Sequence, residues 1–451
     1  MNRRSAKYGK GIYQRCDATC PPQGKTCRVH MWSYYVELPN GPNGQRRQWT
    51  KSGFVTAKEV ADARNHTIVS DQSGLLPSNG KQTVEDWLTG WLEGKTGSES
   101  IRSTTAFAYR MHVDKYLIPY LGHMRLIDLR PRHVTDMLIA IRKEHEEKRS
   151  KALTANAIFD TEAEELNRAT PRRRKNQARI KAKHIPVPRP FGPATAHRLR
   201  ATLRSALNAA VRAGEVPRNV ASLADVAKAS RAKVKVWEPE QLGEFLDAIA
   251  EESDRLHPLF HLAAFAGLRR GELCGLRWQD VDLEKRIIDV TWQRTTAGHR
   301  VVESTPKTDC AESRVDIDER TTKLLQRHRK NQIEERLRWG PAWHDTGLVF
   351  TRENGAGLHP DFVSYRFEKL VERHGLPRIT LHKLRHLAAS LQIAAGVDIA
   401  IVSKRLRHSS IKITNDTYGH MIGTIGRQAA EAAAALVPLK NTGEASGKKP
   451  A

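Results

Sequence analysis

The sequence predicts a multidomain protein that is mainly α-helical with small β-sheets. Its 451 residues exceed what one compact domain usually holds. Two stretches typical of linkers, residues 74–81 and 225–237, separate parts of different pattern. These parts are a β-rich unit at residues 1–73, a helical unit at 82–224 and an α+β unit at 238–437. A polar tail at 438–451 is expected to be disordered.

The first unit is expected to contain a β-hairpin followed by a helix. Trp32–Leu38 is aromatic and β-branched, and Arg46–Thr50 follows it after a turn rich in proline, asparagine and glycine. Thr56 and Glu59 have the spacing of a capping box, which predicts a helix start. A small sheet carrying arginines and aromatics could enter a DNA groove, and a purely structural hairpin fits the same pattern.

The second unit is expected to be a bundle of four helices. Thr83 can cap the first helix, the second covers residues 103–121, and the third follows Pro131. In the fourth, residues 194–213, leucine or valine recurs every four residues. A highly charged insertion at about 145–190 separates the last two helices. We expect the insertion to be a solvated, partly disordered loop, and a phosphate-contacting arm is the alternative.

The composition favours a nucleic-acid partner. Lysine and arginine number 75 against 50 aspartates and glutamates, which gives a net charge of +25. A ribosome-associated or merely basic protein would show the same excess. No segment resembles a signal peptide or a membrane span, so we expect an intracellular protein with no membrane partner. The five cysteines are an odd number in a reducing compartment, so we expect no disulfide framework.

The most informative stretch for chemistry is Leu381–His386. On a helix, His382 and Arg385 lie three residues apart and share a face. An imidazole beside a guanidinium suits the oxygens of a phosphodiester, because arginine offers two parallel donors. Taken alone, such a pair is usually a solvated surface.

Other motifs stand in a fixed order around this stretch. Upstream is a Gly-Leu-Arg-Arg-Gly-Glu-Leu run, then two alternating strand-like segments with a lysine ahead of the second. Downstream are a late histidine and a Thr-Tyr-Gly-His run. The positions are 267–273, 286–292, 307, 314–318, 408 and 417–420. This ordered set resembles the catalytic domain of the tyrosine recombinases, the phage integrase family. The parts before it are similar to the SAM-like core-binding and arm-binding domains of integrases, especially those of actinobacterial phages and integrative elements.

The resemblance implies a role for each matching residue. Arg269 and Arg385 would clamp the scissile phosphate, and His382 and His408 would hydrogen-bond it and assist proton movement. Lys307 would protonate the departing 5′ oxygen. Tyr418 would be the nucleophile and would leave a 3′-phosphotyrosyl link. Glu272 would support the site. Tyr418 could otherwise be a packing tyrosine, Lys307 a common hairpin lysine, and Arg270 is easily confused with Arg269.

The resemblance also implies the function and partners. We expect a site-specific recombinase that integrates and excises a phage or integrative element in the cytoplasm of a bacterial host. It would act on double-stranded attachment sites as a homotetramer, with an excisionase and a host DNA-bending protein as candidate partners. No cofactor should be required, because arginines and a lysine stabilise the charge. The alternatives are a catalytically inactive DNA-binding protein and a type IB topoisomerase-like enzyme.

Three features lie outside this set. Arg407 stands where the family often has glycine, and Leu387 where it often has threonine. Four zinc-capable side chains gather near the N-terminus, and they predict either structural zinc or free thiols; they are Cys16, Cys20, Cys27 and His30. The alanine-rich run Arg427–Leu436 is expected to be a helix that docks on a neighbouring subunit or on its own domain.

Overall fold

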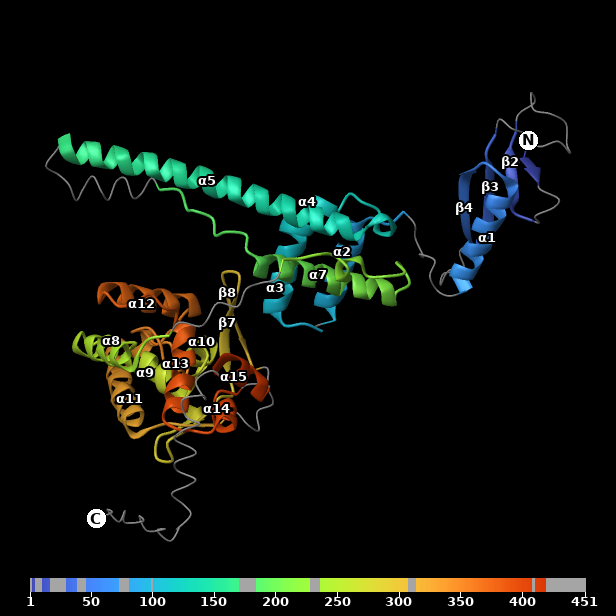
Figure 1. Ribbon diagram of the computed structural model, residues 1–451. Coiled ribbons are helices and arrows are strands. Elements are labelled where there is room, and N and C mark those ends of the chain that lie inside the picture. The colour runs from blue at the N-terminus through green and yellow to red at the C-terminus, as the bar shows by residue number, and fades with distance from the viewer. Residues whose placement is uncertain are drawn as a thin grey trace, which may run out of the picture. The chain divides into compact units, whose positions relative to one another are not determined.

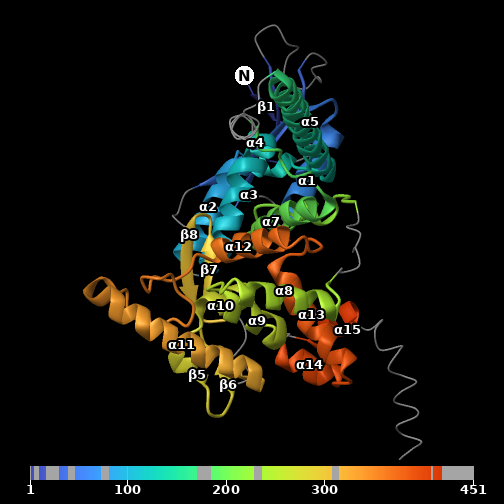
Figure 2. The same ribbon diagram turned by 90° about the vertical axis from the view of Figure 1, so that its left-hand side faces the viewer.

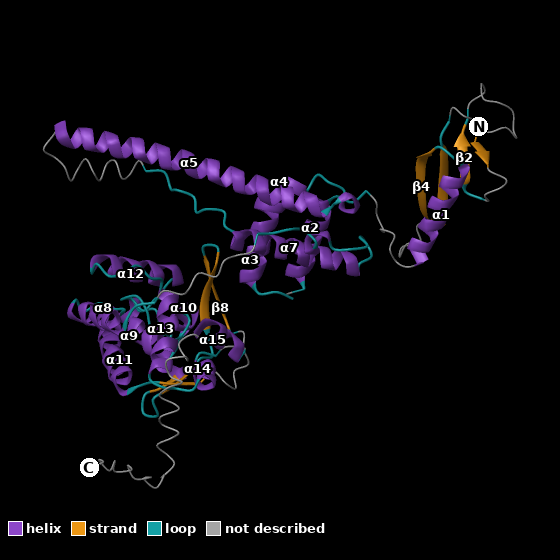
Figure 3. Cartoon of the chain, viewed as in Figure 1, coloured by secondary structure: helices purple, strands orange, loops and turns teal. Residues whose placement is uncertain are grey.

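The chain divides into two compact units, residues 1–230 and 231–451, and the boundary lies in the predicted linker. The computed structural model describes residues 2–4, 10–16, 30–38, 46–72, 81–98, 100–169, 184–227, 236–306, 314–407 and 410–418. Figure 3 shows helices predominating in these residues, with small antiparallel sheets. The predicted fold class, multidomain and mainly α with small β-sheets, is confirmed.

An antiparallel sheet with one helix begins the chain. Its strands, in the spatial order β1-β2-β3-β4, are Asn2–Arg4, Ile12–Arg15, Trp32–Leu38 and Arg47–Phe54. Helix α1 (Ala57–Gln72) covers the sheet, and its Thr67 hydroxyl hydrogen-bonds Tyr34 Oη at 2.5 Å. The predicted hairpin is β3-β4. The predicted capping box is also confirmed, because Glu59 N–H donates to Thr56 Oγ1 at 3.2 Å.

The helical unit follows the predicted order. The Thr83 hydroxyl accepts the Asp86 N–H at 3.1 Å, which caps the first helix as expected. The second predicted helix is continuous but changes to π-helical winding in its middle. The indole of Trp87 donates to Ala206 O at 3.0 Å and ties the first helix to the last. The elements are α2 (Val84–Gly97), α3 (Ser103–His112), a π-turn (Val113–Leu117), α4 (Ile118–Leu121), a 3₁₀ turn (Leu126–Asp128), α5 (Pro131–Ala169), α7 (Pro193–Arg212) and a 3₁₀ turn (Val220–Ser222).

The insertion differs from the prediction. The expected loop is helical over residues 145–169, as the long extension of α5 (Figure 1). Residues 184–192 have no regular structure but return along this helix, where Asn156 Nδ2 donates to Ile185 O at 2.9 Å and Ile185 N–H donates to Asn156 Oδ1 at 2.8 Å. Arg149 donates to Pro188 O at 2.8 Å. These contacts stabilise the helical extension. Its residues are highly charged, so the composition alone did not distinguish a helix from a solvated loop. Residues 170–183 lie outside the described residues.

The second unit consists of helices and two small sheets (Figure 2). They pack around one hydrophobic core. Trp237, Phe245, Phe260 and Phe367 make the centre of this core. The two strands predicted around residues 286–318 are paired as β6 and β9. The strands are β5 (Val281–Asp282), β6 (Ile287–Asp289), β7 (Gln293–Ala297), β8 (Arg300–Ser304) and β9 (Arg314–Asp316). The helices are α8 (Pro239–Glu251), α9 (His257–Ala266), α10 (Arg270–Gly275), a 3₁₀ turn (Trp278–Asp280), α11 (Glu319–Trp339), a 3₁₀ turn (Gly340–Ala342), α12 (Pro360–Arg373), α13 (Leu381–Ala394), α14 (Ile399–Arg405) and α15 (Ile411–Tyr418).

Four motif-bearing segments of this unit lie together. Helix α13 packs against α9 and α14, and α14 packs against α15. Helix α9 is followed by Gly267, which caps its C-terminus with a φ of +64°, a conformation that glycine favours. A Cβ there would lie 2.6 Å from Leu406 Cδ2, so the turn after α14 is packed directly on the turn after α9.

Among the described residues, no helix is both long and apolar enough to cross a membrane.

Candidate functional site

A buried carboxylate organises the arginine motif. Glu272 is 1% exposed and accepts the Arg269 N–H at 2.7 Å and the Arg269 guanidinium at 2.7 Å. It also accepts a hydrogen bond from the Arg407 guanidinium, which comes from the turn after α14. Arg269 in turn donates to the Arg407 carbonyl at 3.1 Å. Hydrogen bonds therefore run in both directions between the two motifs, which lie 138 positions apart in the chain.

The electrostatics of this cluster favour its charged form. Burial by itself would raise the pKa of Glu272, but the Arg407 and Arg269 guanidinium groups outweigh it and lower the pKa below its ordinary value. Burial lowers the pKa of Arg407, and the carboxylate of Glu272 opposes that effect. An arginine remains charged under both influences.

Arg407 has an unusual backbone. Its φ is +53°, in the left-handed region, and its side chain is only 4% exposed. A side chain other than glycine is disfavoured in this region. Glycine would adopt this conformation without steric cost, so Arg407, which was noted in the sequence as a departure from the family resemblance, is a strained residue. Sequence reasoning noted the departure but missed the contact with Glu272.

Arg385 is buried on α13, and its guanidinium points into the same cluster. Its two terminal nitrogens donate to the carbonyl oxygens of Gly267 and Leu406. It thereby fastens the turn after α9 to the turn after α14. Of the two arginines predicted to bind phosphate, Arg269 has the more accessible side chain, at 40% exposed.

His382 and His386 lie one turn apart on α13, with their rings at 85° and centroids 5.1 Å apart. His382 is exposed on α13, but neighbouring protein atoms partly desolvate its imidazole. This desolvation lowers the pKa of His382, and the positive charges of Arg385 and Arg269 lower the pKa further. Burial, with His382 and Arg385, lowers the pKa of His386 to about 4. A neutral His382 can accept a proton at neutral pH.

Arg269 and Arg270 have separate partners. Arg270 Nη1 donates to Asp361 Oδ1 at 2.8 Å and to Ser364 Oγ at 3.0 Å, so its side chain is held against α12. Arg269 instead enters the cluster with Glu272. This difference supports the choice of Arg269 as the candidate phosphate ligand.

The remaining predicted site residues are placed less fully. Tyr418 is the last residue of α15, the helix that packs against α14. Lys307 and His408 lie outside the described residues. Lys307 follows, by three positions in the sequence, the strand β8 whose partner β7 packs on α10. His408 directly follows Arg407.

The predicted zinc ligands are only partly described. Cys16 is buried at the end of β2, and Gln14 donates to the His30 carbonyl at 2.7 Å. Cys20 and Cys27 lie outside the described residues, so structural zinc stays a prediction. Cys274 is a core residue as expected, and burial raises the pKa of its thiol to about 12. The predicted helix at 427–436 also lies outside the described residues.

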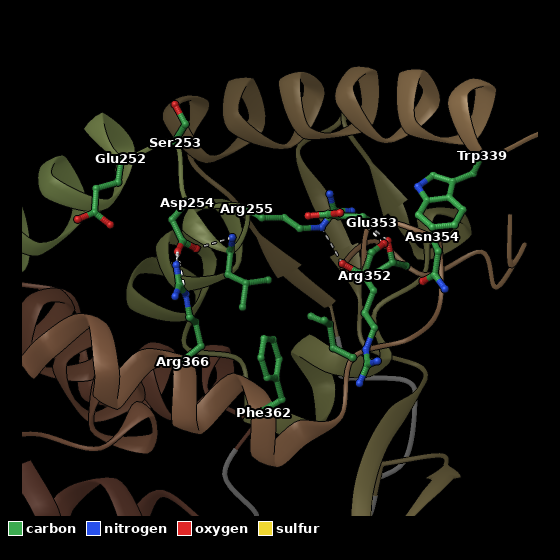
Figure 4. A pocket seen from close by; sticks show the side chains of 13 residues that line it. Glu252, Ser253, Asp254, Arg255, Trp339, Arg352, Glu353, Asn354, Phe362 and Arg366 are labelled. Carbon is green, nitrogen blue, oxygen red and sulfur yellow. Dashed lines mark hydrogen bonds and ion pairs between the residues drawn. The ribbon is translucent and has the colours of Figure 1, made fainter. Parts of the chain in front are cut away.

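A pocket lies elsewhere in the second unit. It encloses about 800 Å³ between the loop before α9, the end of α11 and the start of α12 (Figure 4). Two partly buried ion pairs lie at this pocket, Asp254 with Arg366 and Arg255 with Glu335. Of the predicted catalytic residues that the structure describes, none lines this pocket.

Comparisons with known proteins agree with the resemblance seen in the sequence. A family model described as the phage integrase family matches residues 235–422, and one described as the phage integrase N-terminal SAM-like domain matches residues 83–139. A XerC-like tyrosine recombinase of Caldanaerobacter subterraneus subsp. tengcongensis is 32% identical over 205 residues, covering 42% of this chain and 51% of that protein. The chain spans about half the length of the curated relatives that it matches at this identity.

Two further similarities extend over more of the chain. An integrase of Saccharopolyspora erythraea is 23% identical over 416 residues, covering 80% of this chain and 84% of that protein. A solved structure of the Tn1549 transposon integrase, in complex with transposon right end DNA, has 18% identity and a TM-score of 0.56. The match covers 77% of this chain and 99% of that one. At this identity the structural match concerns the fold.

Proposed function

Because the chain belongs to the phage integrase family, we propose that it is a site-specific DNA recombinase that cuts and rejoins strands through Tyr418. The Tyr418 oxygen attacks the scissile phosphorus, the bond from phosphorus to the 5′ oxygen breaks, and a 3′-phosphotyrosyl bond forms. The 5′ oxygen leaves with a proton that Lys307 supplies. The new bond keeps the energy of the broken one, so attack by another 5′ hydroxyl rejoins the strands without ATP.

The observation that carries this proposal is the convergence of four motif segments. Arg269, His382, Arg385 and the turn at Leu406–Arg407 share one cluster, and the helix that ends at Tyr418 packs beside that turn. A phenol has an ordinary pKa of about 10, so it needs cations and a base nearby to attack phosphorus. The cluster offers both kinds of group.

The proposed roles of Arg269 and Arg385 follow from the exposure of their side chains. Arg269 binds a non-bridging phosphate oxygen and neutralises charge that grows in the transition state. His382 and His408 hydrogen-bond the phosphate and assist proton movement. The Arg385 guanidinium already donates hydrogen bonds to the carbonyls of Gly267 and Leu406, and a phosphate would compete with these acceptors. Part of the contribution of Arg385 is therefore to hold these two turns together.

We propose that the reaction needs no cofactor. The charge on the phosphate is stabilised by arginines and by Lys307, which take the part that a metal ion plays in other nucleic-acid enzymes. Strand transfer should therefore proceed at an undiminished rate in excess EDTA. A rate that falls with chelator and returns with a divalent cation would contradict this part of the proposal.

The proposed substrate is a pair of double-stranded attachment sites bound by four copies of the chain. The net charge of +25 supports a DNA partner. The N-terminal sheet and the helical unit would add DNA contacts outside the catalytic unit. An excisionase and a host DNA-bending protein are proposed partners for directional control, and the bacterial cytoplasm is the proposed location.

The test is a recombination assay on supercoiled plasmid that carries two of the element's attachment sites. We expect wild type to exchange strands between the sites and Tyr418→Phe to bind them without exchange. Relaxation of plasmid that lacks attachment sites would favour a type IB topoisomerase-like activity. Binding without any strand transfer by wild type would favour an inactive DNA-binding protein.

A further inference from the structure

Two guanidinium groups share one buried carboxylate beneath the proposed phosphate site. Glu272 accepts hydrogen bonds from Arg269 and Arg407, and it is 1% exposed. Arg269, Arg407 and Glu272 together therefore carry one net positive charge. Without Arg407, the negative charge of Glu272 would neutralise the positive charge of Arg269. The Arg269 guanidinium would then be attracted to the carboxylate rather than to a phosphate.

Arg407 contacts Glu272 although its backbone has a strained conformation. Its φ of +53° suits glycine, and its buried Nε has no hydrogen-bond partner among the described residues. Strain of this kind persists only where surrounding contacts impose it. Here those contacts are the Glu272 carboxylate, the Arg405 carbonyl at 3.4 Å and the Arg269 guanidinium on the Arg407 carbonyl at 3.1 Å.

We infer that Arg407 is a positioning residue for strand cleavage, which keeps the Arg269 guanidinium available to the scissile phosphate by sharing the charge of Glu272. The inference rests on the proposed function. Arg407 itself is 4% exposed on its side chain and acts through Glu272 and Arg269 without touching DNA.

The experiment measures the rate of covalent adduct formation on suicide DNA that carries the attachment core, at saturating DNA, with the full chain. The variants are Arg407→Gly, Arg407→Lys, Glu272→Gln and the double variant Arg407→Gly/Glu272→Gln. Lys404→Ala is the matched control, because it removes one exposed positive charge from the neighbouring helical turn without touching Glu272. Non-covalent DNA affinity and the unfolding midpoint are measured for each.

We expect Arg407→Gly to slow adduct formation about tenfold or more, a size of effect known for residues that orient the ligands of metal sites. Its DNA affinity should change less than about threefold, because many other phosphate contacts hold the DNA. Glycine accepts the backbone conformation, so a folding defect is not expected from φ. The double variant should be faster than Arg407→Gly, since it removes the carboxylate that competes for Arg269. Arg407→Lys should also exceed Arg407→Gly, and Lys404→Ala should keep the wild-type rate.

Three results would overturn the inference while leaving the proposed function intact. One is an Arg407→Gly rate equal to wild type. Another is a double variant no faster than Arg407→Gly, which would reduce Arg407 to a structural role. The third is an Arg407→Lys variant that is folded and no faster than Arg407→Gly. If wild type itself forms no adduct, the proposed function fails, and this inference fails with it.

Discussion

Replacing Glu272 with glutamine keeps the shape of the buried side chain and removes its charge. In wild type the carboxylate faces the Arg407 guanidinium, whose side chain is 4% exposed, and the Arg269 guanidinium, which is 40% exposed. The variant leaves Arg407 as a buried cation with no anion among the described residues around it. The pair with Arg269 matters less for stability, because solvent screens it.

The expected loss of stability is large for one substitution. Removing one partner of a buried ion pair costs about 3–5 kcal/mol. The lower figure, about 3 kcal/mol, applies to Glu272→Gln, because the amide oxygen still accepts one hydrogen bond. For a unit of roughly 200 residues this corresponds to a fall in the unfolding midpoint of about 6–12 °C.

Scanning calorimetry of the full chain measures this effect as a shift of the transition that belongs to the second unit. The matched control is Glu319→Gln, which breaks an exposed pair with Lys323 at 2.8 Å and should produce no resolvable shift. If Glu272→Gln lowers the midpoint no more than the control does, the Glu272–Arg407 pair does not stabilise the fold, and the reasoning is refuted.

The same pair has a pH signature. The folded pKa of Glu272 lies below its ordinary value of 4.5, mainly because the two arginines outweigh burial. Its contribution is therefore fully present above the pKa of the unfolded chain and is lost as pH falls through the folded pKa. The difference in unfolding midpoint between wild type and Glu272→Gln should be constant above pH 6 and should shrink below about pH 4.5. A difference that grows on acidification would contradict the assigned charge states.

Two further predictions concern packing. Gly267→Ala should lower stability more than Gly375→Ala, measured as unfolding midpoints. Both positions have positive φ, +64° and +68°, but only the first would bring its Cβ to 2.6 Å from another side chain, that of Leu406. Equal losses would show that the turns are not tightly packed. Asn156→Ala should speed hydrogen exchange at the Ile185 amide, which now donates to the Asn156 carboxamide at 2.8 Å; an unchanged rate would mean that the return segment does not dock on α5 in solution.

Local signals in the sequence accounted for much of the fold. Helix starts at Thr56 and Thr83 were predictable because a cap and its partner lie three residues apart. Strand β3 was predictable from its aromatic and β-branched residues, and β6 and β9 were predictable from the alternation of apolar and polar residues. The helical extension of α5 was not, because its contacts reach across to residues 184–188 and its own composition is as polar as that of a loop.

In the candidate site, too, the sequence identified the residues but not the contacts between them. The motif order identified Arg269, His382, Arg385 and Tyr418 as candidates without any geometry. It did not reveal that the Arg385 donors reach two backbone carbonyls, or that Arg407 contacts Glu272 from 135 positions away. Such contacts depend on how α9, α13 and α14 pack together, and no local pattern encodes that.

The central claim is that Tyr418 forms a covalent bond to DNA. The most direct measurement is mass spectrometry of the adduct trapped on suicide DNA with the attachment core, for wild type and Tyr418→Phe. The account predicts one adduct, on the peptide that contains Tyr418 and through the 3′ phosphate, and none with the variant. Tight binding of this DNA by wild type without an adduct, or an adduct on another residue, would contradict it.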